Sequence, residues 1–219
     1  MKKKTICIIL TAACLCMALV DAVLRPGYGL KSALKLSLFL ILPWIFCYRR
    51  DKNALKALFS LKKVGIWPLF LGAGVYLGIL GLYFVARNFF DFSGVDGALQ
   101  KDLGVNAGNF VWVSLYISFV NSLLEEFFFR GFGFLTLKTV SSRRFAGLFS
   151  AALFALYHVA MMIGWFHWSL VALLIFGLVL AGLLFQALDE RSGTLYPSWL
   201  VHMFANFAIN TVGFLLLGI

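Results

Sequence analysis

The chain has 219 residues, of which 62% are hydrophobic and only 13% are charged. A soluble globular domain is typically about half apolar and one quarter charged, so this composition excludes an ordinary water-soluble fold and makes the lipid bilayer the expected solvent. The formal charge of +10 could suggest a nucleic-acid partner, but the Lys and Arg residues lie between apolar segments, where an anionic membrane leaflet explains them better.

Apolar segments of bilayer-spanning length predict about seven transmembrane helices. At roughly 20 residues for each span they fill one transmembrane domain over residues 1–219. We expect an all-α fold, because an open sheet in hydrocarbon leaves backbone groups unpaired and a barrel would show short alternating strands. The predicted spans are 5–24, 33–48, 66–88, 110–133, 145–164, 168–188 and 197–218.

The first of these segments follows three lysines and resembles a secretory signal. We expect a retained helix, because the apolar stretch continues past Cys14 with no soluble domain behind it. Cys7, Cys14, Cys16 and Cys47 show no spacing typical of a zinc site or a disulfide framework, so we interpret them as small buried apolar residues.

Positive charge alternates between the loops and predicts the orientation. Lys and Arg cluster at residues 2–4, 49–63 and 138–144, which places the N-terminus in the cytoplasm and, with seven spans, the C-terminus outside. The opposite loops agree, because residues 89–109 are acidic and residues 164–168 form an aromatic belt of the kind found at membrane interfaces.

A short amphipathic helix is predicted between the second and third spans. Its apolar residues recur at helical spacing opposite lysines, which favours a helix that lies on the inner membrane surface. The apolar positions are Ala54, Leu55, Leu58, Phe59 and Leu61, and the lysines are Lys52, Lys56, Lys62 and Lys63.

The fourth span carries several polar residues. Ionisable groups at bilayer depth cost a few kcal/mol each, so they require a partner or a wet cavity. Helical spacing places Asn121 and Glu125 on one stripe, with Glu126 and Arg130 on the adjacent stripe. Glu126 and Arg130 can therefore neutralise each other, whereas Glu125 is left as an acceptor without a local cation.

Two further spans contain a histidine. His158 lies in the fifth span, and a single histidine in an apolar helix is more often structural than catalytic. The seventh span carries four polar residues at i, i+4 spacing, which are Ser198, His202, Asn206 and Asn210. Interhelical hydrogen bonds could explain the Ser and Asn residues, but a histidine among them is harder to explain in this way.

Depth in the bilayer gives a separate argument. With a rise of 1.5 Å per residue from the predicted cytoplasmic ends, Glu125 and His158 lie about 20 Å deep, and His202 and Asn206 about 9 and 15 Å deep. We therefore expect all four to meet in one cavity that opens inward. Asp21, Arg87 and His167 fall near the outer ends and are excluded.

These motifs resemble the CAAX prenyl protease and bacteriocin-processing (CPBP, or Abi) family of intramembrane peptidases. Glu125, Glu126 and Arg130 form EExxxR, Phe154 and His158 form FxxxH, and His202 and Asn206 form HxxxN. The resemblance covers residues 115–210, and we place the peptidase core at about 110–215. Each motif is weak alone, but three in order, each on its own apolar helix, are specific.

The resemblance implies an intramembrane endopeptidase. Glu125 would be the general base, with His158 orienting the water, and His202 and Asn206 would stabilise the oxyanion. Glu126 and Arg130 would support the site. Zinc is an open question, because Glu125, His158 and His202 are acceptable ligands. The compact HExxH pattern of soluble zinc peptidases is absent, and we favour the metal-free scheme.

Other functions are compatible with the same polar residues. A transporter or ion-conducting protein also uses intramembrane carboxylates and histidines, although no inverted repeat is visible. A scaffold or immunity factor could use them to fix helix packing alone. For a peptidase, the family precedents for substrates are prenylated C-terminal peptides, bacteriocin leader peptides and membrane-anchored regulators. The lysine-rich start favours a bacterial cytoplasmic membrane.

Overall fold

The structure is a computed structural model that describes residues 3–61, 64–92, 105–162 and 166–219. Within these ranges every regular element is a helix and no strand occurs, which confirms the all-α prediction. The α-helices are α1 (Lys3–Leu19), α2 (Tyr28–Lys35), α3 (Leu42–Arg50), α4 (Lys52–Leu58), α5 (Trp67–Ala86), α7 (Phe110–Tyr116), α8 (Ser122–Glu125), α9 (Arg143–Met162), α10 (Trp168–Ser192) and α11 (Tyr196–Leu217). Single-turn and longer π-helical segments extend them at Val20–Leu24, Leu36–Ile41, Ile117–Asn121 and Glu126–Thr136, and a 3₁₀ turn follows at Leu137–Thr139.

Six helices in the described ranges are long and apolar enough to cross a bilayer, so the chain is an integral membrane protein. They are Lys3–Leu24, Gly29–Arg50, Trp67–Ala86, Phe110–Thr139, Trp168–Ser192 and Tyr196–Leu217, and each overlaps a predicted span. The remaining predicted span, 145–164, falls on α9, which is not among these six helices of the described residues; α9 packs against α1 and α10 in the bundle.

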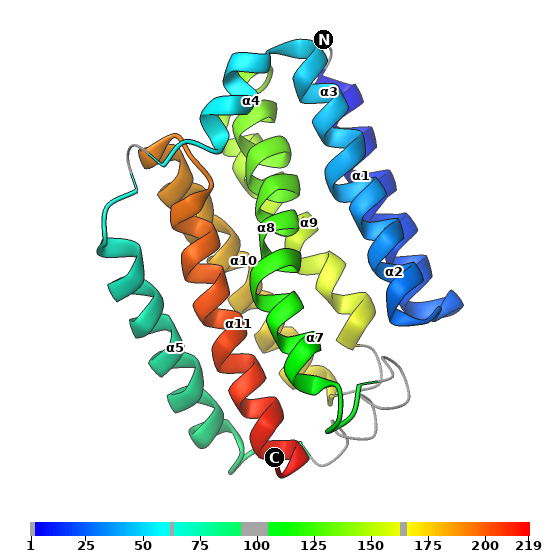
Figure 1. Cartoon of the computed structure of the whole chain (residues 1–219), viewed down its shortest axis with the longest axis vertical. Coiled ribbons are helices and arrows are strands. Elements are labelled where there is room, and N and C mark those ends of the chain that lie inside the picture. The colour runs from blue at the N-terminus through cyan, green and yellow to red at the C-terminus, as the bar shows by residue number, and fades with distance from the viewer. Residues whose placement is uncertain (1–2, 62–63, 93–104, 163–165) are drawn as a thin grey trace.

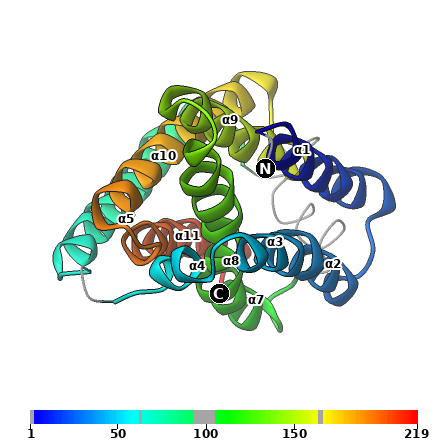
Figure 2. The same cartoon turned by 90° about the horizontal axis from the view of Figure 1, so that it is seen from above.

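The Phe110–Thr139 helix, which contains α7 and α8, is the central helix of the bundle. Figure 2 shows it between α1–α3 on one side and α5, α10 and α11 on the other. The N-terminus and the short helix α4 lie at one end of the bundle, and the C-terminus lies at the opposite end (Figure 1). Side chains at the middle of the central helix can therefore contact both halves.

Phenylalanines of the central helix form much of the core. Phe39 of the second span stacks on Phe128 with the ring centroids 3.9 Å apart and the planes 6° from parallel. Other fully or nearly fully buried rings on the central helix are Phe127, Phe129, Phe132 and Phe134. Because lipid is as apolar as these rings, close packing rather than removal from water holds them together.

Glycines allow helices to approach closely at three contacts. A Cβ on Gly72 of α5 would lie 2.6 Å from the Phe204 ring of α11, and one on Gly213 would lie 2.5 Å from Phe110. A Cβ on Gly182 of α10 would lie 3.0 Å from the Cβ of Ala151 on α9. Small residues serve this purpose in membrane bundles, and here they allow α11 to pack on α5 and on the central helix, and α10 to pack on α9.

The turn between α10 and α11 is fixed by polar contacts. Gly193 has a positive φ of 73°, which a residue without a Cβ adopts readily. Ser198, near the start of α11, donates from its backbone N at 3.2 Å and from Oγ at 2.7 Å to the Asp189 carboxylate. These bonds set the start of α11, and with it the direction of the side chains one turn later.

The predicted amphipathic helix is present as α4, but its environment differs from the expectation. Leu55 and Leu58 are buried in the protein core instead of facing the membrane surface. The Leu58 carbonyl accepts hydrogen bonds from Thr194 Oγ1 and the Leu195 backbone N, both at 2.9 Å. The helix therefore covers the α10–α11 turn. Lys62 and Lys63 lie outside the described residues.

Two minor predictions have mixed outcomes. All four cysteines are free, as expected, and Cys14 and Cys47 are buried, but Cys16 is exposed. Much of the predicted acidic loop (93–104) and part of the aromatic belt (164 and 165) lie outside the described residues. Within that belt, the described Trp168 is exposed.

Candidate active site

Three helices, the central helix, α9 and α11, bring Glu125, His158 and His202 together inside the bundle. His158 Nε2 and His202 Nε2 each lie 3.8 Å from Glu125 Oε2. Glu125 is 2% exposed and lies near the middle of the 30-residue central helix. These are three of the four residues expected to share one cavity.

His158 is oriented by its own helix. Its Nδ1 lies 2.7 Å from the carbonyl oxygen of Phe154, one turn earlier, and only a protonated Nδ1 can bond to that oxygen. In the neutral ring, Nε2 then carries the lone pair and faces Glu125. The FxxxH motif thus has a physical explanation, because Phe154 supplies the backbone acceptor and packs its ring against the imidazole.

His202 is oriented from another helix. Its Nδ1 lies 2.7 Å from Glu126 Oε1 of the central helix, and its ring stacks on Phe185 of α10 at a centroid distance of 5.4 Å. A carboxylate accepts, so His202 donates from Nδ1. This bond turns Nε2 toward Glu125, and the two adjacent glutamates therefore contact opposite sides of the same imidazole.

Glu126 and Arg130 form the ion pair that their i, i+4 spacing predicts. Glu126 Oε1 lies 3.2 Å from Arg130 Nη1, and both side chains are fully buried. The guanidinium carbon lies 4.0 Å from the ring centroid of Phe154 and 4.9 Å from that of Phe185. Arg130 is therefore held between the aromatic residues that also contact the two histidines.

Glu125 has no cation close in sequence, as predicted, but a distant helix supplies one. Lys35 of the second span places Nζ 2.6 Å from Glu125 Oε1, and the two side chains are 7% and 2% exposed. Lys35 Nζ also donates to Asn121 Oδ1 at 2.5 Å, while Asn121 Nδ2 donates to Glu125 Oε1 at 3.0 Å. The signal in the sequence was a lysine inside an apolar span.

The polar stripe of α11 divides between several partners. Asn206 Nδ2 donates to the Ile117 carbonyl at 3.2 Å, and Asn210 Nδ2 donates to Ser118 Oγ at 3.0 Å. Both bonds join α11 to the central helix, while Ser198 bonds to Asp189. His202 is thus the member of the stripe in direct contact with the glutamates. The role of Asn206 at the oxyanion stays a prediction.

Asp189 is a buried carboxylate that was not among the predicted site residues. It is 0% exposed and accepts both hydrogen bonds from Ser198. The predicted sixth span ends at residue 188, which left Asp189 outside the apolar segment. In the fold it fixes the start of the helix that carries His202.

The donor atoms around Glu125 have the chemistry of zinc ligands but not the spacing. Across the part of the chain that the structure describes, no three His, Cys, Asp or Glu side chains lie close enough together to hold a metal ion. Tetrahedral zinc brings its ligand atoms to about 3.4 Å from one another, compared with 3.8 Å between Glu125 Oε2 and each imidazole.

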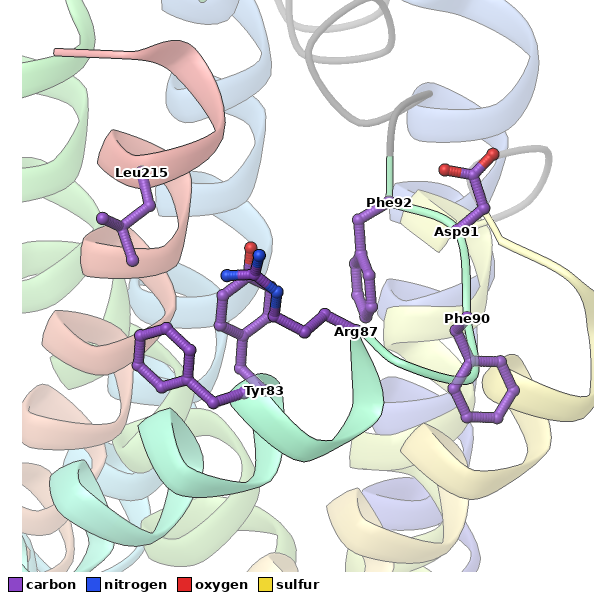
Figure 3. Close-up of a pocket in the computed structure, with 7 residues that line it drawn as sticks. Tyr83, Arg87, Phe90, Asp91, Phe92 and Leu215 are labelled. Atoms are coloured by element: carbon purple, nitrogen blue, oxygen red, sulfur yellow. The ribbon is translucent and has the colours of Figure 1, made fainter.

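A separate pocket lies at the C-terminal end of α5. Tyr83 and Leu215 line one side and Phe90, Asp91 and Phe92 the other, with Arg87 between them (Figure 3). None of these residues belongs to the Glu125 cluster. Arg87 was placed near an outer end by the sequence, and this pocket is not part of the candidate active site.

Comparison with known families places part of the chain near one described family. The family model described as "Type II CAAX prenyl endopeptidase Rce1-like" matches residues 107–208. The matched segment includes Glu125, Glu126, Arg130, His158, His202 and Asn206. Comparisons with curated proteins and with solved structures found no match.

Proposed function

Because residues 107–208 form a domain of the Rce1-like type II CAAX prenyl endopeptidase family, a family of peptide hydrolases, we propose that Glu125, His158 and His202 are the catalytic centre of an intramembrane endopeptidase. The observation that carries the proposal is the meeting of one carboxylate oxygen with two imidazole nitrogens, each 3.8 Å away, from three separate helices.

Glu125 is the proposed general base. A separation of 3.8 Å exceeds a direct hydrogen bond, but a water oxygen bonded to both atoms at about 2.8 Å spans it. Glu125 Oε2 removes a proton from this water as its oxygen attacks the peptide carbonyl carbon. The same proton is then given to the amine nitrogen as the C–N bond breaks.

His158 orients the nucleophile. Its Nδ1–H donates a hydrogen bond to the Phe154 carbonyl, so its Nε2 lone pair is left to accept a hydrogen bond from the second hydrogen of the water. With one hydrogen directed to Glu125 and the other to His158, an oxygen lone pair of the water is left for attack. Such positioning accounts for a large part of the rate that enzymes achieve in hydrolysis.

His202 and Asn206 are proposed to stabilise the oxyanion. His202 already donates from Nδ1 to Glu126, so donation from Nε2 requires the imidazolium, which the hydrogen bond to the Glu126 carboxylate stabilises. The Asn206 amide nitrogen has two hydrogens, one of which forms a hydrogen bond to the Ile117 carbonyl. Its second hydrogen is available to the substrate oxygen.

We propose that this chemistry proceeds without a metal. The geometry at Glu125 suits hydrogen bonds through a water better than it suits zinc coordination. If zinc bound, Glu125, His158 and His202 would hold it, and it would supply a Lewis acid and an activated water.

The substrate is proposed to be a peptide or protein at the membrane, with prenylated C-terminal CAAX sequences as the first class to test. Bacteriocin leader peptides and membrane-anchored regulators follow. We further propose a bacterial cytoplasmic membrane, with the N-terminus in the cytoplasm and the C-terminus outside. The lysine- and arginine-rich segments at α4 and the N-terminus lie at one end of the bundle (Figure 1), which supports this orientation.

The test uses the purified full chain in detergent and a quenched fluorescent peptide that ends in a farnesylated CAAX sequence. We expect an increase in fluorescence and a single new C-terminus by mass spectrometry. A comparison of protein termini in host cells with and without the chain would identify other substrates. Absence of cleavage in both assays would contradict the proposed function.

A further inference from the structure

Lys35 is the charged group closest to Glu125, and it lies outside the segment that matches the family. Its helix, Gly29–Arg50, ends well before residue 107, where the matched segment begins. Lys35 is 5% exposed, and its Nζ lies 2.6 Å from Glu125 Oε1. The second span therefore contributes directly to the surroundings of the proposed base.

A lysine at this depth needs a specific reason. Its ammonium group sits over aromatic rings, 5.4 Å from the centroid of Phe39 and 5.0 Å from that of Tyr157. A charged side chain in the middle of a span costs a few kcal/mol on insertion scales, and such residues usually mark function. Glu125 offsets the charge of Lys35, and Lys35 offsets that of Glu125.

The contacts divide the two oxygens of Glu125 between different tasks. Oε1 accepts from Lys35 Nζ and from Asn121 Nδ2, at 2.6 and 3.0 Å. Lys35 also fixes Asn121, whose Oδ1 accepts from the same Nζ at 2.5 Å. Oε2 faces His158 and His202 at 3.8 Å. Oε1 is thus held by hydrogen bonds from Lys35 and Asn121, which also bond to each other, and Oε2 is directed at the imidazoles.

We propose that Lys35 is a positioning residue for the peptidase reaction, which fixes the Glu125 carboxylate through Oε1 so that Oε2 faces the two histidines. This inference rests on the proposed function. It also means that the working active site requires a helix from the N-terminal part of the chain in addition to the matched segment.

If Lys35 only held two helices together, its loss should affect cleavage no more than the loss of another ion pair between helices. Lys31 provides the matched control, because it lies one turn earlier on α2 and pairs with Asp21 of the first span, far along the chain from the catalytic motifs. Lys31→Met breaks an ion pair between the first two spans without touching Glu125. Lys35→Met breaks one at Glu125.

The first experiment measures kcat and KM with the farnesylated peptide. We expect Lys35→Met to lower kcat by about 100-fold with KM within about twofold of wild type, because a misplaced catalytic group costs rate rather than binding. Lys35→Arg, which keeps the charge, should retain more activity than Lys35→Met. Lys31→Met should keep the wild-type kcat. Equal losses in Lys31→Met and Lys35→Met, or no loss in either, would overturn the proposal.

The second experiment needs no substrate. Thermal unfolding is compared for wild type, Lys35→Met, Glu125→Gln and the double variant. Lys35→Met leaves a buried carboxylate unpaired, so removing that charge by Glu125→Gln should raise the melting temperature of the Lys35→Met protein. Additive effects would overturn the pairing. If wild type cleaves no substrate, the proposed function fails, and this cycle alone decides whether Lys35 holds Glu125.

Discussion

His202 Nδ1 donates a hydrogen bond to Glu126 Oε1 at 2.7 Å, from α11 to the central helix. The bond fixes which nitrogen of the imidazole faces Glu125. The two glutamates of the EExxxR motif therefore have different tasks, because Glu125 contacts Nε2 and Glu126 contacts Nδ1. Adjacent residues on a helix point about 100° apart, which lets them reach different sides of one ring.

Replacement of Glu126 tests this division. In Glu126→Gln the carboxylate that accepts the hydrogen bond from His202 Nδ1 becomes a neutral amide, so we expect kcat to fall by about 100-fold or more, with the protein still folded. The measurement is the cleavage rate of the farnesylated peptide at saturating concentration. Glu190→Gln, at a carboxylate paired with Lys138 and Arg143 at the end of α10, is the control. A rate near wild type in Glu126→Gln would contradict the role assigned to Glu126.

Loss of Arg130 should affect stability as well as activity. Arg130→Met leaves the fully buried Glu126 without its cation, and breaking a buried pair in this way costs about 3–5 kcal/mol in the free energy of unfolding. Chemical or thermal unfolding in detergent measures the change. Arg144→Met, at an exposed position at the start of α9, should leave stability unchanged. Equal stability of the two variants would refute the structural role of the pair.

Close packing of α9 on α10 should be needed to place His158. A Cβ at Gly182 would meet Ala151 Cβ at 3.0 Å and its backbone Cα at 3.2 Å, so Gly182→Val must push the helices apart. We expect a loss of about 1–3 kcal/mol in the free energy of unfolding, together with slower cleavage. Gly177 lies on the same helix, and a Cβ there would have no atom within 4 Å, so Gly177→Val is the matched control. Equal effects of the two substitutions on unfolding and cleavage would contradict the packing argument.

Chelation separates the two chemical schemes. The metal-free scheme predicts that incubation with 1,10-phenanthroline leaves the cleavage rate unchanged. Loss of activity that returns when zinc is added would contradict this scheme and make Glu125, His158 and His202 the first ligands to test by substitution. Metal analysis of the purified protein gives a second reading that does not depend on activity.

Much of the fold follows from local patterns in the sequence. The hydropathy of a segment depends only on consecutive residues, so apolar helices can be located without knowledge of the fold. The described apolar helices coincide with predicted spans. The Glu126–Arg130 pair was also predictable, because its members are four residues apart on one helix. The central helix continues to Thr139, beyond the predicted end at residue 133, and Phe134 and Leu137 of this extension are buried in the protein.

Contacts between distant segments could not be read from the sequence. Lys35 and Glu125 are 90 residues apart, and their pairing depends on how the second span packs against the central helix. The burial of Leu55 and Leu58 depends in the same way on the position of the α10–α11 turn. An amphipathic pattern gives an apolar face, but it does not distinguish lipid from protein as the surface that this face contacts.

The assignment of Glu125 as the base is tested by the cleavage rate of Glu125→Gln, measured at equal protein concentration beside His158→Ala, with His167→Ala as the control. Glutamine keeps the shape of the side chain and an oxygen that can accept from Lys35 and Asn121, but it cannot accept a proton from water. We predict that cleavage of the farnesylated peptide is lost in Glu125→Gln and His158→Ala, retained in His167→Ala, and that all three proteins accumulate in the membrane. Full activity in Glu125→Gln would contradict the assignment of Glu125 as the base.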